Sequence, residues 1–156
     1  LHFSEANEIF LEKSPCDTLF FMRIIRSVIK AADRLKDIKQ SHIMIPEGDL
    51  FNKKYFSSHF ESLDQWEEFP RFLSVREFCN PYKVFRKFFG YQDAEKWQYD
   101  LKEIIDTALS QCKGELHLEV ISVYSHLSKL MEAAHLINVR EVVHIGGILK
   151  SRFNNV

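Results

Sequence analysis

The sequence has few of the features that mark several common protein classes. Its 156 residues include three cysteines, an odd number, spaced too widely for a Cys-x-x-Cys zinc ribbon and not suggesting a disulfide framework. Lysine and arginine number 21 against 22 aspartate and glutamate, so the formal net charge of −1 gives no overall attraction for a polyanion. Any nucleic-acid surface must therefore be a local patch.

Long apolar runs are missing as well. The longest such stretch, "TLFFMRIIRSVI" at 18–29, is interrupted by Arg23 and Arg26. It falls far short of the roughly 20 apolar residues that a membrane-spanning helix needs, so we expect no membrane partner. Isolated cysteines suit buried thiols in a reducing compartment, and we therefore expect a cytoplasmic protein.

Glycine and proline are scarce, and the remaining composition is that of a folded chain. Hydrophobic residues make up 46% and charged residues 28%, which excludes intrinsic disorder. A chain of this length buries about two thirds of the surface of its unfolded state, so we expect one hydrophobic core. The fourteen phenylalanines predict that this core is rich in aromatic side chains.

The sequence does contain a succession of helix patterns with recognisable boundaries. Ser14 and Pro15 suit the N-cap and first position of a long helix, "SVRE" at 74–77 is a capping-box pattern, and Asn80-Pro81 interrupts the chain. Apolar residues recur at intervals of three and four within each segment. The predicted buried faces include Phe21, Ile25 and Val28 in the long helix from Pro15, and Val120, Tyr124 and Met131 in the helix over 116–137. Helices are predicted over 4–13, 15–40, 82–90, 93–113 and 116–137, and from residues 52 and 74.

These patterns predict an all-α fold, an irregular bundle of six or seven helices in a single domain over 1–156. The segment "HIMIPEGDL" contains Pro46 and Gly48, and we expect a hinge at 42–51 between an N-terminal helical hairpin and the main bundle. Two alternatives stay open for 138–150. Asn138 can cap a further helix, whereas "VVHI" before two glycines suits one short C-terminal strand or an extended tail.

Glu-x-x-His occurs twice near the C-terminus, as Glu132/His135 and as Glu141/His144. Di-metal carboxylate bundles take this unit from each of two different helices. On one continuous helix the two units would face opposite directions about 13 Å apart, and only a sharp break at Asn138 could join them. Glu132 also falls on the predicted solvent side. We therefore predict an ordinary helix surface and no cofactor, and we keep a metal site at these four residues as a third hypothesis.

A second constellation lies at 69–91, where cations alternate with aromatic residues. Such interleaving can bind single-stranded nucleic acid, with bases on the rings and phosphates on the cations. Tyr82, Phe85 and Phe89 recur at three and four, however, and this spacing predicts a buried helix face. The predicted nucleic-acid patch, which would contact backbone phosphates, consists of Arg76, Lys83, Arg86 and Lys87.

The remaining segment of interest is "YFSSHFESLDQWEEF" at 55–69. Trp66 and Phe69, close to several acidic residues, are candidates for a partly exposed partner surface or for self-association. The sequence has no Gly-x-Ser-x-Gly, no phosphate-binding glycine loop and no His-Glu-x-x-His, so we expect no enzyme. The favoured function is a non-enzymatic interaction or regulatory module, with a nucleic-acid-binding domain as the alternative.

Overall fold

The computed structural model describes residues 15–37, 45–56, 70–109, 118–142, 144–145 and 148–149. Within these ranges the protein is helical, as the sequence predicts, with five α-helices where six or seven were expected for the whole chain. The α-helices are α2 (Pro15–Leu35), α3 (Val75–Cys79), α4 (Tyr82–Tyr91), α5 (Ala94–Leu109) and α6 (Val120–Glu141). Two 3-10 turns, η1 (Glu47–Asp49) and η2 (Lys53–Tyr55), precede α3.

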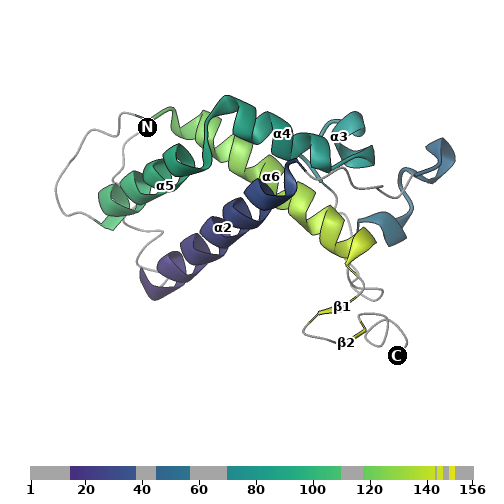
Figure 1. Cartoon of the computed structure of the whole chain (residues 1–156), viewed down its shortest axis with the longest axis horizontal. Coiled ribbons are helices and arrows are strands. Elements are labelled where there is room, and N and C mark those ends of the chain that lie inside the picture. Colours follow the sequence, from purple (N-terminus) through teal and green to yellow (C-terminus); the bar gives the residue numbers. More distant parts are fainter. Residues whose placement is uncertain are drawn as a thin grey trace.

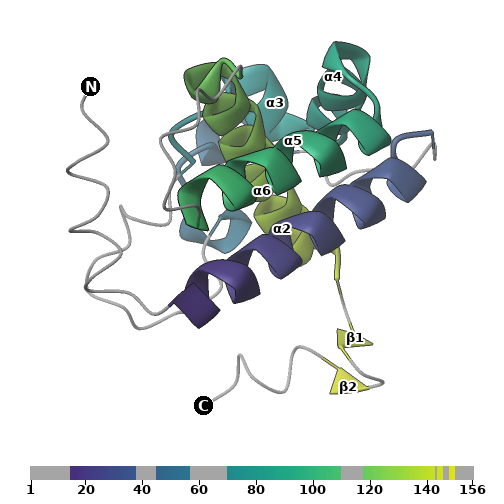
Figure 2. The ribbon, with the colours of Figure 1, turned by 90° about the vertical axis from the view of Figure 1, so that its left-hand side faces the viewer.

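Helix α6 is the central element of the bundle. It packs against α2, α3, α4 and η2, and Figure 1 shows α2 crossing it. Helices α2 and α5 run side by side, as Figure 2 shows from a second direction. Because α6 has neighbours on several sides, it carries much of the core.

The core is rich in aromatic side chains, as expected. Trp97 stacks on Phe88 with ring centroids 4.1 Å apart, and its indole N–H donates to the Phe88 carbonyl at 3.2 Å. Both side chains are almost fully buried. The main cluster contains Ile29, Ala32, Val84, Phe85, Phe88, Trp97, Leu101, Val123, Leu130, Ala133 and Ile137, and a smaller one contains Phe56, Phe78 and Leu136.

The predicted boundaries between α3 and α4 are confirmed. Ser74 and Glu77 form both halves of a capping box, α3 ends before Asn80, and Pro81 precedes the first residue of α4. Helix α4 continues one residue beyond Gly90, where the sequence analysis ended it. The helix predicted from Asn52 begins as the 3-10 turn η2, and residues 57–69 lie outside the described ranges, as do the cap Ser14 and the helix predicted at 4–13.

The C-terminal alternatives are also resolved. Helix α6 passes through Asn138 without a break and ends at Glu141. Beyond it, β1 (His144–Ile145) pairs antiparallel with β2 (Ile148–Leu149), where one short strand or an extended tail was expected. None of the described helices combines the length and the apolar character needed to cross a membrane.

Some predicted core residues lie on the surface. Phe21 of α2 is 57% exposed, and Val120 and Tyr124 of α6 are 44% and 60% exposed. The side chain of Cys16 is exposed too, although the sequence analysis took all cysteines as buried. These errors fall in the first two turns of α2 and α6.

Candidate functional site

The first Glu-x-x-His unit fastens two distant parts of the chain to one turn of α6. The Glu132 carboxylate accepts hydrogen bonds from the backbone N–H groups of Arg71, Phe72 and Leu73, at 2.7 to 3.2 Å. His135 donates from Nε2 to the carbonyl of Phe56 at 2.8 Å, since a carbonyl can only accept. Residues three apart lie on the same face of a helix. The pair therefore holds both ends of the segment 57–70.

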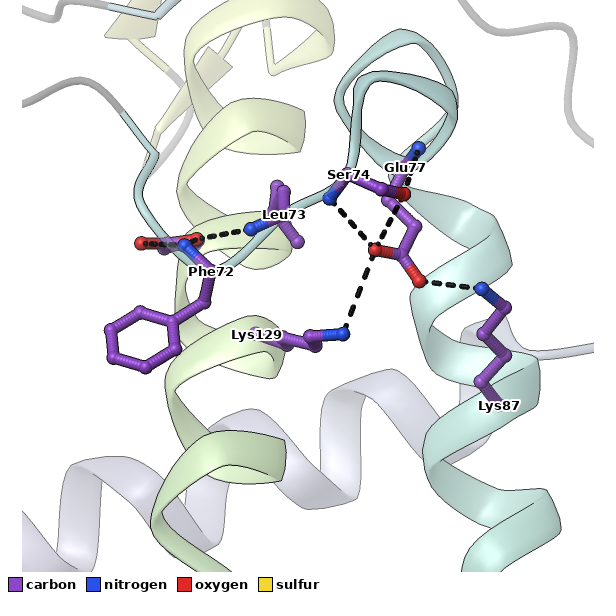
Figure 3. Close-up of polar contacts among 7 residues, drawn as sticks. Phe72, Leu73, Ser74, Glu77, Lys87 and Lys129 are labelled. Atoms are coloured by element: carbon purple, nitrogen blue, oxygen red, sulfur yellow. Dashed lines mark hydrogen bonds and ion pairs between the residues drawn. The ribbon is translucent and has the colours of Figure 1, made fainter. Parts of the chain in front are cut away.

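A second carboxylate, that of Glu77, also accepts a hydrogen bond from a backbone N–H group, at the start of α3. Glu77 accepts from the backbone N–H and the hydroxyl of Ser74, at 2.9 and 2.8 Å, and Figure 3 shows its side chain between those groups and two lysines. Lys87 contacts it at 2.6 Å and Lys129 at 3.8 Å. Burial alone would raise the pKa of Glu77, but these hydrogen bonds and the Lys129 charge hold it at about 2.

The C-terminal end of α6 is anchored in the same manner. Arg140 donates to the carbonyls of Tyr55 and Phe78, and its guanidinium lies 4.4 Å from the centre of the Phe78 ring. Burial lowers the pKa of Arg140 to about 10. Glu141 accepts from the hydroxyl of Tyr82 at 2.6 Å, and burial together with this bond raises the Tyr82 pKa. These contacts tie α6 to η2, α3 and α4.

The three described side chains of the metal hypothesis, Glu132, His135 and Glu141, do not converge in the structure. Glu132, His135 and Glu141 each bond a different part of the chain, and His144 belongs to β1. Because α6 is continuous through Asn138, the first unit and Glu141 keep the separation of a single helix. In the described residues no three histidine, cysteine or acidic side chains are grouped to hold a metal ion. Glu132, predicted to face solvent, is half-buried instead.

The four cations of the predicted nucleic-acid patch are all exposed. Lys83, Arg86 and Lys87 come from α4, which has no acidic residue, and Arg76 comes from the adjoining α3. Arg86 donates to the carbonyl of Lys36, next to the end of α2. Lys87 is paired with the buried Glu77, which offsets its charge, so Arg76, Lys83 and Arg86 carry most of the positive charge of this surface.

Most of the rings interleaved with these cations are covered. Phe85 is buried, and Tyr82 and Phe89 are half-buried. Lys36 lies 5.0 Å from the centre of the Phe89 ring and covers it further. Tyr91, at the end of α4, is 52% exposed, but its ring stacks on His126 with centroids 4.2 Å apart. This surface therefore offers mainly contacts for phosphate groups. Trp66 and Phe69, the predicted partner surface, lie outside the described residues.

An exposed apolar surface that was not predicted from the sequence lies on the N-terminal half of α2. Leu19, Phe20, Phe21 and Ile24 are 43%, 60%, 57% and 37% exposed. A shallow, open hollow runs along the helix beside them, lined by Phe20, Arg23, Ile24, Ser27, Val28 and Ala31. Helical spacing places Phe20, Ile24 and Ala31 on one side of α2, opposite the buried Ile29, but spacing alone does not tell which side is buried.

No protein-family model matches the chain, and comparisons with curated proteins and with solved structures give no match either.

Proposed function

We propose that the protein is a non-enzymatic interaction module and that it binds a protein partner through the N-terminal half of α2. The observation that supports this most is the set of four large apolar side chains exposed together on that helix. Contiguous exposed apolar surface of this kind marks interaction sites in soluble proteins. Fully burying one such side chain contributes about 1.5–3 kcal/mol, so a few of them can drive binding.

The polar groups of the described residues support the same proposal. Glu77, Glu132, His135, Arg140 and Glu141 all bond groups of the protein itself. Apart from the capping contact between Glu77 and Ser74, each of these contacts joins the end of a helix or a loop to a neighbouring element. We take them as the framework that presents α2, and we assign the binding to its surface.

Site-specific photo-crosslinking tests the proposal. A photoreactive phenylalanine analogue replaces Phe20 in the source cells, and the matched control carries it at Tyr99, an equally exposed aromatic residue of α5. We expect covalent adducts, identified by mass spectrometry, at position 20 that disappear when Ile24→Glu is added. Equal adducts at both positions, or adducts that survive Ile24→Glu, would show that α2 is not the binding surface.

Nucleic-acid binding is the second candidate function, and the exposed cations of α4 favour it. A backbone-only contact of this kind depends steeply on salt concentration. The test is fluorescence anisotropy of a labelled single-stranded oligonucleotide at low and moderate salt. Lys83→Glu with Arg86→Glu should abolish binding, whereas Lys102→Glu on α5 should not. Lys87 is left unchanged because it stabilises the buried Glu77. Binding that resists the paired reversal would contradict this candidate.

A further inference from the structure

The outward face of α2 carries a regular stripe of six residues. Their spacing alternates between three and four, which is the spacing of the contact seam between two paired helices. All six are exposed, and four of them line the hollow described above. In order along the helix they are Asp17, Phe20, Ile24, Ser27, Ala31 and Arg34.

The stripe is complementary to itself when read in the opposite direction. Its spacing is the same from either end, so two copies of α2 can pair antiparallel about the midpoint between Ile24 and Ser27. In that pairing Phe20 of one copy lies opposite Ala31 of the other, and Ile24 lies opposite Ser27. A large side chain therefore meets a small one at every apolar position, which is how facing helices interdigitate.

The charges at the two ends of the stripe match in the same alignment. Asp17 lies in the first turn of α2 and Arg34 in the last. Antiparallel pairing brings Asp17 of each copy opposite Arg34 of the other, once at each end of the seam. Complementary charges of this kind fix the register and direction of a pair.

We infer that the protein forms a symmetric dimer in which α2 pairs antiparallel with α2 of a second copy. This inference rests on the proposed function, because it names the partner of the same surface. A two-fold interface requires a patch that fits itself, and the stripe has both the shape and the charge pattern for this. The seam spans about 25 Å, the length of a single helix contact, so we expect reversible association at micromolar concentrations.

One flank of the seam opposes association and makes the geometry testable. Arg23 and Lys30 lie on the same side of the stripe, and antiparallel symmetry places this flank of one copy beside the same flank of the other. Like charges therefore face each other there. Lys30→Glu should tighten the dimer severalfold, because it places an acid beside Arg23 of the partner. An acidic partner protein would respond to the same change with weaker binding.

Sedimentation velocity over a hundredfold range of protein concentration measures the association directly. We expect the mass to rise from one chain to two, and Ile24→Glu to hold the protein at one chain at every concentration. The matched control is Ile121→Glu, at an 80% exposed position of α6, which should dimerise normally. All of these positions are exposed, so folding should be unaffected and is checked by circular dichroism.

Charge exchange tests the alignment. Asp17→Arg or Arg34→Asp alone should weaken the dimer by at least about fivefold, and the two together should restore it to within about twofold. A dimer that shows no such rescue, or that survives Ile24→Glu, would overturn the antiparallel α2 pairing. A wild-type protein that stays monomeric would overturn the dimer itself. Position-20 crosslinks to a different protein, abolished by Ile24→Glu, would in that case still support the proposed function.

Discussion

At the scale of single residues, two carboxylates organise the chain from Arg71 to Ser74. Glu132 accepts from the N–H groups of the first three residues and Glu77 from that of the fourth. Backbone donors in such an irregular stretch have no helix or sheet partner, and leaving them unbonded at a half-buried position is costly. A single side chain therefore stabilises three consecutive peptide groups.

Replacing Glu132 should consequently destabilise the fold. We expect Glu132→Ala to lower the free energy of unfolding by about 2–3 kcal/mol, since it leaves three amides without an acceptor. Glu132→Gln keeps one acceptor oxygen and should cost less. Urea denaturation measures the difference, and hydrogen exchange should show faster exchange at 71–73. Asp106→Asn, in an exposed ion pair on α5, is the control and should change stability by less than about 0.5 kcal/mol.

Glu77 makes stability depend on pH in the acid range. Its pKa is about 2 in the folded protein against 4.5 ordinarily, so its contribution is complete above pH 4.5 and is lost as the pH falls toward 2. At about 1.4 kcal/mol for each pH unit, that contribution reaches roughly 3 kcal/mol.

The Glu77→Gln variant isolates this effect. Glutamine retains the capping-box geometry but cannot ionise. Thermal unfolding is followed by circular dichroism between pH 6 and pH 2. The melting temperature of the wild type should exceed that of the variant at pH 6, and this difference should shrink as the pH falls toward 2. A constant difference between the two proteins at every pH would mean that Glu77 does not carry this stability.

These residue contacts show where the sequence is uninformative. The capping box could be predicted because its two members, Ser74 and Glu77, are three residues apart. Glu132 and the amides that it binds are about sixty residues apart in the sequence, and helical periodicity placed Glu132 on the solvent side of its helix. In the structure, residues 70–74 pack along α6 and cover that side, so Glu132 accepts hydrogen bonds from their backbone instead of facing solvent.

At the scale of elements, α6 shows why periodicity located the helix but not its buried face. The predicted buried set included Val120, Tyr124 and Met131, whereas Leu130, Ala133 and Leu136 are the fully buried residues. Buried and half-buried residues extend around most of the circumference of the helix because α2, α3, α4 and η2 contact it from different sides. A helix with several partners has no single apolar stripe to read.

Truncation at two positions of α6 should separate its buried and exposed parts. Leu130→Ala removes a fully buried side chain from the main cluster and should lower the free energy of unfolding by about 2–5 kcal/mol. Ile121→Ala, at the 80% exposed position, should change it by less than about 0.5 kcal/mol. Similar losses at both positions in urea denaturation would contradict the packing of α6.

In helix α2, a residue predicted to be buried is exposed. Phe21 was assigned to the core because its spacing fits Ile25 and Val28, yet its side chain is exposed. A helix that binds a partner has two apolar faces, one toward the core and one toward the partner. Periodicity records both and cannot distinguish them without the position of the neighbouring helices.

At the scale of the whole molecule, association should be visible in thermal stability. A dimer that forms only from folded chains raises the melting temperature as protein concentration increases. For a chain of this size each kcal/mol corresponds to about 2–4 °C. We therefore expect a rise of a few degrees over a hundredfold increase in concentration, measured by calorimetry. Ile24→Glu should remove that rise.

The all-α class followed from composition and helix boundaries, which are local properties of the sequence. The assembly of the bundle did not, because it depends on contacts between segments far apart. Arg140 illustrates this: nothing in the residues around it indicates that its guanidinium will bond carbonyls of η2 and α3. The exposed surface of α2 likewise became recognisable only after its buried face was fixed.

The anchoring of Phe56 and Arg71 on one turn of α6 fixes these two attachment points relative to each other. They are held by His135 and Glu132, and fourteen residues, 57–70, join them along the chain. In polymer terms these two contacts close a loop, and the entropy lost in closing it is offset by side chains of α6.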